Sequence, residues 1–453
     1  MFIESLGKTC RCTVSESSTS KSTLRRKKEM NNARGKGNNV LRRDSGGPSI
    51  GEVGGSCARR AMDDVRTGFD VQKDVDWKAT SCTDCTGDEL VARLEEADPE
   101  AAQTVRERVA APKDEDISYF PRFVVEELGL VPSSSSSSST SASPPQQTRS
   151  DRDDGGGGWS IVVGTTGIDG MDVTLTVVCR SADVRERLEH ERLMVTVAFA
   201  VRCISRLREA CGGVAEFAPG RRALRVTVIL CRREREIPHA GVIGPKHVNA
   251  GVTSLMTKHV IVYRAQHVHK VLVHELVHCA GLDAQLHGMH DMEADADAWV
   301  RAGLGYDTVA GGGLRCHEAY VETLACYWNM FRWCPRAGRA EWEGERALFE
   351  ANSASIWRQQ TRHRQRSGIP TLLEATHVLA YYHIKAALWS MLHLVPAWPK
   401  DGLGVSAFWS AVKAGLRRNG PPRPLSARQA APFESDRFGG DRSTALMTGI
   451  GDP

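Results

Sequence analysis

The sequence predicts an α+β fold, in which a small twisted β-sheet backed by one helix is followed by an active-site helix and a helical C-terminal part. Two observations predict it. Between residues 159 and 282, short stretches rich in β-branched residues alternate with longer stretches that have helical periodicity. After residue 290, apolar residues recur at helical spacing.

Composition divides the 453-residue chain into three regions. Residues 1–158 are predicted to be a disordered N-terminal region and linker, because Lys, Arg, Ser and Gly predominate at the start and a run of Ser at 133–139 is followed by Pro and Gly. Within this region, residues 88–109 and 120–130 have the spacing of short helices. Residues 159–418 form the predicted folded domain, and residues 419–453 form a disordered tail rich in Pro, Arg and Gly.

Charge, cysteine content and hydropathy limit the classes of function. A net charge of +4 is too small for this length to predict nucleic-acid binding. The 13 Cys have no regular spacing and the first residues lack the apolar segment of a secretory signal, so we expect an intracellular, cytoplasmic protein with reduced thiols. A basic, Ser-rich start is also typical of organelle transit peptides. No apolar run is long enough to predict a membrane span.

One pair of cysteines stands out by its spacing. Cys82 and Cys85 form a CxxC pair, which occurs in structural zinc sites and in redox motifs. No second pair with this spacing accompanies it, so the pair by itself predicts neither kind of site.

The predicted domain has the element order strand, strand, helix, strand, strand, helix. A long helix is expected at residues 184–210, capped by the Ser and Asp before it and ended by Gly212 and Gly213. Residues 232–254 are expected to form a loop that contains Gly and Pro, and a loop of this length inside a compact domain is usually functional or flexible. Strands are expected at 161–163, 172–179, 222–231 and 259–263, and helices from about 265 and at 291–303, 314–333, 339–365, 371–394 and 405–416.

The helix expected from about residue 265 carries the sequence HELVH at residues 274–278. Because His274 and His278 are one helical turn apart, both imidazoles can reach a single metal ion. Glu275 lies beside them, where its carboxylate can take a proton from an attacking water. This is the HExxH arrangement of zinc hydrolases. A chance match in a chain with 15 His is the alternative, but apolar neighbours predict a buried helix, and a buried helix needs a reason to hold these polar groups.

A catalytic zinc needs a third protein ligand, for which Glu318 is the first candidate. Forty residues separate it from His278, enough for the chain to turn and return antiparallel. Its neighbours are apolar, which predicts a buried helix. Glu322, one turn further on, lies on the same face, where it can accept a hydrogen bond from a ligand imidazole and fix its orientation.

Other residues, Glu322 among them, remain open as the third ligand. Glu293 also has a carboxylate one turn on, but it follows His278 by only 15 residues, and surface acids on an amphipathic helix explain it well. His287 and His290 lie on the loop after the metal helix, and Asp283 lies directly after it.

Peptide hydrolysis also needs a group that stabilises negative charge on the attacked carbonyl oxygen. Tyr381, Tyr382 and His383 in a late predicted helix are candidates, and of these we expect Tyr382. Aromatic packing in the core is the alternative explanation for each of them.

HExxH followed by a distant helical Glu resembles the gluzincin metallopeptidases, in which an acidic residue stands four positions after that Glu, as Glu322 stands after Glu318. The segments 249–253 (NAGVT), 261–264 (IVYR), 270–275 (KVLVHE) and 318–322 (EAYVE) are similar to zincin-like proteins of large nucleocytoplasmic DNA viruses and algae. The resemblance covers residues 159–394. It departs from the gluzincins at Glu322, which is one methylene longer than the usual Asp.

The resemblance implies a zincin-like fold, a bound Zn²⁺ and a peptidase that acts on a peptide or protein substrate. In such an architecture the strand at 259–263 would be an edge strand that pairs with extended peptide. Two other functions remain open. An inactive protein that only holds zinc is one, although the intact Glu275 argues against it. A nucleic-acid-associated protease is the other, suggested by the basic start and by Arg-rich residues 358–366, for which a solvated helix face is the alternative.

Overall fold

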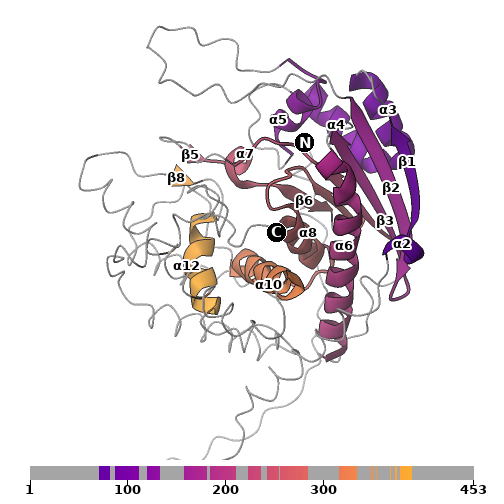
Figure 1. Cartoon of the computed structure of the whole chain (residues 1–453). Helices are drawn as coiled ribbons and strands as arrows, with labels where there is room; N and C mark the ends of the chain where they lie inside the picture. The colour runs from indigo at the N-terminus through magenta and orange to yellow at the C-terminus, as the bar shows by residue number, and fades with distance from the viewer. Residues whose placement is uncertain are drawn as a thin grey trace, which may run out of the picture. The chain divides into compact units, whose positions relative to one another are not determined.

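The computed structural model of the protein describes residues 71–81, 87–111, 120–132, 158–180, 184–210, 223–235, 242–254, 256–283, 316–333, 373–374 and 378–389, with positions 347, 350, 354 and 368. These residues form a mixed α+β fold around a six-stranded sheet (Figure 1). The predicted α+β class is therefore confirmed. Among the described residues, no helix has both the length and the apolar character needed to cross a bilayer.

The sheet contains both antiparallel and parallel pairs. A tight hairpin joins its two longest strands, and the turn residues Asp169 and Gly170 both have positive φ, as a two-residue hairpin turn requires. In sheet order the strands are β1 (Asp76–Ser81), β2 (Trp159–Ile168), β3 (Met171–Arg180), β4 (Ala223–Ile229), β7 (His259–Val262) and β6 (Gly251–Ser254). The β3–β4 and β4–β7 pairs are parallel, and the others are antiparallel.

Helices cover both faces of this sheet. The described helices are α2 (Val71–Asp74), α3 (Gly87–Ala97), α4 (Pro99–Ala110), α5 (Arg122–Glu127), α6 (Val184–Ala210), α7 (Pro245–Val248), α8 (Val268–Cys279), α10 (Cys316–Trp333) and α12 (Val378–Trp389). A separate parallel pair joins β5 (Val242–Ile243) to β8 (Leu373–Glu374). Residues 232–254, expected as one loop, thus contain β5, α7 and β6 as well.

The alternation of side chains along each strand divides the interior into two cores. Val228 and Val262 point to the face covered by α6 and α8, and the core on this side continues into α10 and α12. Their neighbours Ile229 and Ile261 point to the opposite face, which is covered by α3, α4 and α5. Figure 1 shows α6 along one side of the sheet and α3 and α4 on the other.

The expectation that all of residues 1–158 lie outside the folded domain is wrong for three segments. β1 pairs with β2 over its whole length, from Asp76 with Thr165 to Ser81 with Ser160. Helices α3 to α5 contribute apolar side chains to the second core. The Ser run, Cys82 and Cys85 lie outside the described residues, as do residues 419–453.

One buried carboxylate ties this helical layer to the sheet. Asp98, only 2% exposed, divides the expected helix at 88–109 into α3 and α4 and caps α4 by accepting a hydrogen bond from the Ala101 amide (3.2 Å). Its other oxygen accepts hydrogen bonds from Thr227 of β4 and from Nε2 of His259 in β7 (2.8 Å). A single side chain therefore contacts two strands from the helix side.

Replacement of Asp98 with Ala is expected to lower the free energy of unfolding by about 3 kcal/mol, because buried His259 loses an anionic partner and α4 loses its cap. Urea unfolding measures this loss. Glu95→Ala, which removes an exposed acid from the same layer, is the matched control and should unfold close to wild type. Identical curves for Asp98→Ala and wild type would contradict the role given to Asp98.

The effect should depend on pH. Burial alone would raise the pKa of Asp98, but hydrogen bonds from His259, Thr227 and Ala101 hold it below its ordinary value. A carboxyl group with a lowered pKa in the folded state stabilises the fold above its unfolded pKa of about 4, and this contribution is lost as the pH falls through the folded pKa. The difference between wild type and Asp98→Ala should therefore shrink at low pH.

Several element predictions need correction or lie outside the described residues. The strand expected at 259–263 is internal, since β7 lies between β4 and β6, so the terminal strand on this side is β6. The metal helix begins at Val268 rather than near Ala265, because His267 has a positive φ of 59° that no helix continues through. The expected helix at 184–210 matches α6, and that at 314–333 is close to α10. The helices expected at 291–303 and 405–416 lie outside the described residues.

Candidate metal centre

Helix α8 holds the HExxH residues in a rigid setting. Its apolar residues belong to the core between the sheet, α6 and α10. At its C-terminal end, the Gly281 amide donates to the His278 carbonyl (2.7 Å), and Lys258 Nζ donates to the Cys279 carbonyl (2.8 Å). A cation at a helix C-terminus is favourable for both the unpaired carbonyls and the helix dipole. The second imidazole thus lies in a well-anchored last turn.

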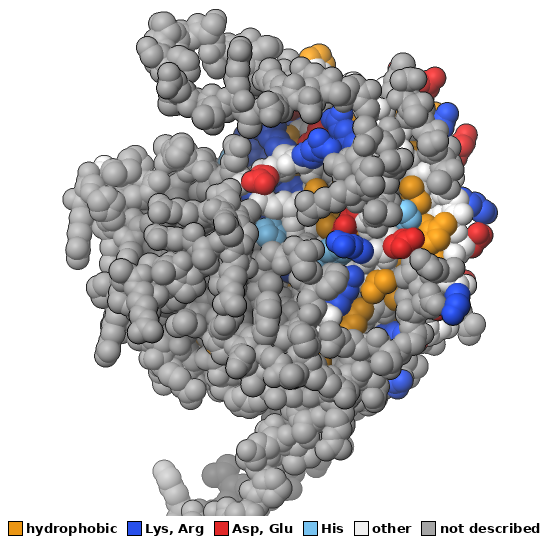
Figure 2. Space-filling model, in the orientation of Figure 1, with side chains coloured by type: hydrophobic (Ala, Val, Ile, Leu, Met, Phe, Trp, Pro, Cys, Tyr) orange, Lys and Arg blue, Asp and Glu red, His pale blue; other side chains and the backbone are white. Residues whose placement is uncertain are grey.

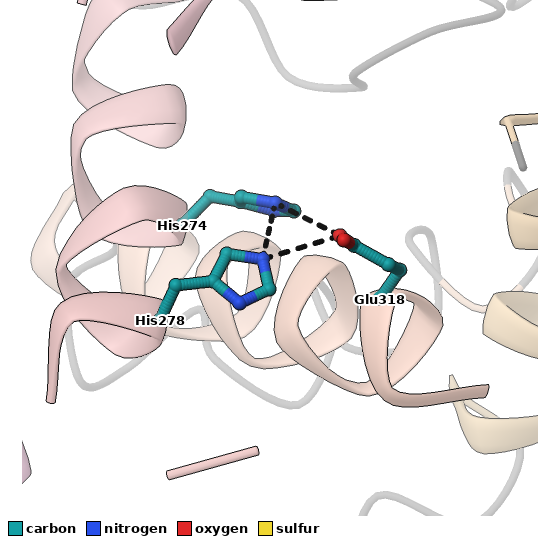
Figure 3. A group of neighbouring side chains, drawn as sticks. All are labelled: His274, His278 and Glu318. Atoms are coloured by element: carbon teal, nitrogen blue, oxygen red, sulfur yellow. Dashed lines mark hydrogen bonds and ion pairs between the residues drawn. The ribbon is translucent and has the colours of Figure 1, made fainter. Parts of the chain in front are cut away.

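Three donor atoms from α8 and α10 converge beside this turn. His274 Nε2 and His278 Nε2 lie 3.2 Å apart. Oε2 of Glu318 lies 3.1 Å from His278 Nε2 and 3.5 Å from His274 Nε2. Figure 3 shows the two imidazoles and the carboxylate pointing toward one common point from the two helices. The structure therefore brings together the three residues predicted as metal ligands.

The separations of these atoms fit a tetrahedral ion. A zinc ion binds His nitrogen and carboxylate oxygen at about 2.0–2.2 Å, which puts neighbouring donors of a tetrahedron roughly 3.3 Å apart. The three observed separations, from 3.1 to 3.5 Å, lie on either side of this value. Among the described residues, this is the one group of His, Cys, Asp and Glu side chains arranged to hold a metal ion. Three protein donors leave the fourth position of a tetrahedron open.

The other nitrogen of His274 is held by the carboxylate predicted for that task. Nδ1 of His274 donates to Oε2 of Glu322 (3.0 Å). Glu322 in turn accepts two hydrogen bonds from Nζ of Lys270 (2.8 and 2.9 Å), and Nζ of Lys385 in α12 lies 3.8 Å from it. A carboxylate can only accept, so this contact fixes the proton on Nδ1 and directs Nε2 to the metal position.

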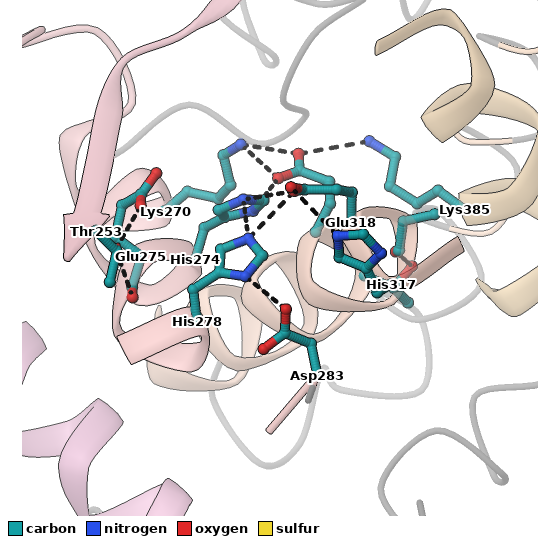
Figure 4. A network of polar contacts seen from close by, with 12 residues as sticks. Thr253, Lys270, His274, Glu275, His278, Asp283, His317, Glu318 and Lys385 are labelled. Carbon is teal, nitrogen blue, oxygen red and sulfur yellow. Dashed lines mark hydrogen bonds and ion pairs between the residues drawn. The ribbon is translucent and has the colours of Figure 1, made fainter. Parts of the chain in front are cut away.

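Asp283 plays the same part for the second imidazole. His278 Nδ1 donates to Oδ2 of Asp283 (2.9 Å), which is 3% exposed. Asp283 is one of the alternatives that the sequence leaves open for the third ligand. It instead contacts the nitrogen that faces away from Glu318, and it is not part of the three-donor group. Each imidazole thus has its own carboxylate at Nδ1, and Figure 4 shows Asp283 beside His278.

The charges of the cluster are mutually stabilised. Burial alone would raise the pKa of Glu318, but the charge on His278 and hydrogen bonds from both imidazoles hold it well below its ordinary value. Burial opposes protonation of His278, yet Glu318 and Asp283 raise its pKa well above the ordinary value. A His ligand binds a metal through a deprotonated nitrogen, so protons and a metal ion would compete for these imidazoles.

Glu275 lies on the other side of the two imidazoles from Glu318 in the view of Figure 4. Its carboxylate accepts a hydrogen bond from the Thr253 hydroxyl of β6 (2.6 Å), and that hydroxyl also lies 3.1 Å from the Glu275 carbonyl. At Gly251, two residues earlier on β6, an added Cβ would lie only 2.7 Å from Glu275 Cγ. The side chain of Glu275 is therefore packed directly on the terminal strand of the described sheet.

No family model, curated protein or solved structure matches the chain. The function is therefore inferred from the site itself.

The remaining candidates have different outcomes. Glu293, His287 and His290 lie outside the described residues. Tyr382 lies on α12, three residues before Lys385, but the structure does not describe its side chain. The contacts of Lys270 and Thr253 with the site are not among the predictions made from the sequence. Lys270 stands one helical turn before His274, and this spacing is a signal for its contact with the site. The sequence has no comparable signal for Thr253.

Proposed function

We propose that this protein is a zinc-dependent metallopeptidase that hydrolyses peptide bonds in a peptide or protein substrate. His274, His278 and Glu318 are the proposed zinc ligands, and Glu275 is the proposed general base. The observation that carries the proposal is the convergence of three donor atoms at tetrahedral separations, two of them from a helix that also carries a carboxylate in the HExxH position. The carboxylates behind both imidazoles support it, because such partners orient metal-binding His residues.

The proposed mechanism assigns one task to each residue. When bound, zinc would supply Lewis acidity, which activates a water and polarises the substrate carbonyl. Glu275 accepts the proton of the attacking water and passes it to the leaving amine. Glu322 and Asp283 keep the two imidazoles in the orientation that presents Nε2.

The terminal strand β6 is the proposed binding place for the substrate main chain. Tyr263 N–H donates to the Ala250 carbonyl (2.8 Å), so these two residues form a hydrogen-bonded pair next to the β6–β7 ladder. Hydrogen-bonded and non-hydrogen-bonded pairs alternate in an antiparallel ladder. The amide and carbonyl groups of Gly251 and Thr253 consequently point away from β7, where an extended peptide can add as a further strand.

Tyr382 is the proposed donor to the carbonyl oxygen that becomes negatively charged during attack. Lys385, three residues later on α12, lies 3.8 Å from Glu322, which contacts a proposed zinc ligand. This contact brings α12, the helix that includes Tyr382, close to the centre, and this proximity supports a donor from α12.

Glu275→Gln separates the proposed peptidase from a protein that only holds zinc. The variant keeps the size of the side chain but removes the base, so we expect it to retain one zinc per chain, measured by elemental analysis, and to lose cleavage of a peptide library. His274→Ala with His278→Ala should lose both zinc and cleavage. If wild type binds zinc but cleaves no peptide, the protein is an inactive zinc-binding protein, and this function is refuted.

A nucleic-acid-associated protease is not favoured by the structure. Figure 2 shows Lys and Arg side chains interspersed with Asp and Glu on the described part of this face, and the net charge is small. Nucleic-acid binding through phosphate contacts weakens steeply with salt. Retention of the protein on DNA at low salt and its release at moderate salt would revive this alternative.

A further inference from the structure

Alternate residues of β6 hold the side chain of Glu275 from one side. Thr253 Oγ1 donates to Glu275 Oε2 over 2.6 Å, a short hydrogen bond to an acceptor that carries charge when ionised. Gly251 is the residue on the same face of the strand two positions earlier. A Cβ there would lie 2.7 Å from Cγ, 2.9 Å from Oε1 and 3.0 Å from Cδ of Glu275. Thr253 thus donates a hydrogen bond to Glu275, and Gly251, without a Cβ, leaves room for the Glu275 side chain.

We propose that Thr253 is a positioning residue, whose hydroxyl aims the carboxylate of Glu275, and that Gly251 is needed because any side chain there displaces that carboxylate. This inference rests on the proposed function, since it assumes that Glu275 acts as the base. A carboxylate on a two-methylene side chain has several rotamers available. A hydrogen bond from a strand that is itself fixed by β7 selects one of them.

The same two residues have a second task in the proposed mechanism. The main-chain groups of Gly251 and Thr253 point to the substrate side of β6, whereas the Thr253 side chain holds the base. A peptide that pairs with β6 is therefore held by the same residues that set the direction of Glu275. Substrate and base keep a fixed separation, which is the condition for efficient proton transfer.

Thr253→Val tests the hydroxyl without removing the branched side chain or the main-chain groups. We expect kcat to fall on the order of 100-fold, as misplacement of a reacting group by about 1 Å can cost. KM and zinc content should stay unchanged. Thr253→Ser restores the hydroxyl and should recover most of kcat. Thr257→Val makes the same change outside β6, at a hydroxyl that donates to Ser254 instead of Glu275, so it is the matched control and should behave as wild type.

A second measurement does not depend on turnover. In crystal structures determined without zinc, the Glu275 carboxylate should move in Thr253→Val and in Gly251→Ala, and should stay in place in Thr253→Ser. If wild type cleaves no peptide, the proposed function fails, and these structures still decide the positioning role. Full kcat in Thr253→Val, or an unmoved Glu275 carboxylate in its structure, would overturn the inference.

Discussion

Glu318→Gln is expected to reduce zinc affinity by several orders of magnitude while the fold is retained. The amide has nearly the shape of the carboxylate, but it replaces an anionic oxygen donor by a neutral one, which zinc binds weakly. Oε2 of Glu318 is the atom that faces both Nε2 nitrogens, so the change falls directly on the proposed coordination sphere. Competition with a chromogenic chelator measures the affinity, and thermal unfolding of the metal-free protein reports the fold.

Glu322→Gln should affect the stability of the fold more, and zinc affinity less, than Glu318→Gln. Zinc affinity should fall by about 10- to 100-fold, as is usual when a group behind a metal ligand is changed. The free energy of unfolding should fall by about 3–5 kcal/mol, more than in Glu318→Gln, because Lys270 would remain buried with its main anionic partner removed. Glu234→Gln, at an exposed position, is the control and should change neither quantity. Equal zinc affinity in Glu318→Gln and wild type would move the third ligand to a residue outside the described part of the chain.

Removal of residues 1–157 is expected to abolish folding. A chain that begins at Gly158 would lack β1 and the helices that cover the second core, and would expose Val178, Ile229, Ile261 and Tyr263 to water. An uncovered apolar sheet face and an unpaired β2 edge both promote aggregation. We therefore expect such a chain to be insoluble or to show no cooperative unfolding transition.

The control is a chain that begins at Val71, which keeps every described residue. It should unfold cooperatively, with a transition close to that of the full-length protein. Limited proteolysis gives a further check, because cleavage inside α3 or α4 should be slow. A cooperative transition at the full-length temperature for the chain that begins at Gly158 would show that the N-terminal helices contribute nothing to the domain.

The elements that the sequence predicted well carry local signals. The helix at 184–210 has apolar residues at helical spacing over its whole length and two Gly after its end, and α6 has these bounds. Composition predicts that the helical layer from α3 to α5 lies outside the domain, because its partners, such as Ile229 and Ile261, are distant in sequence. Strand order is also a long-range property. β6 has only four residues, and so short a segment gives no local signal that it ends the described sheet.

The same contrast between local signals and long-range packing applies to the residues of the site. The spacing of His274 and His278 follows from one helical turn, so sequence alone brings these two imidazoles together. The approach of Glu318 depends on the packing of α10 against α8, and the sequence offered it only as one of several alternatives. The sequence also could not distinguish a ligand from a residue behind a ligand. Asp283 lies on Nδ1 of His278, a distinction that depends on a ring orientation fixed by tertiary contacts.

The split of the donor set between α8 and α10 has a consequence for folding. Any cation held there cross-links two helices whose contributing residues are 40 positions apart, and the unfolded chain offers no such site. Binding therefore adds to the free energy of unfolding, by about 2.7 kcal/mol when the free metal exceeds its dissociation constant 100-fold. The supply of metal would then affect the lifetime of the folded protein as well as its activity. A chelator would destabilise the contact between α8 and α10.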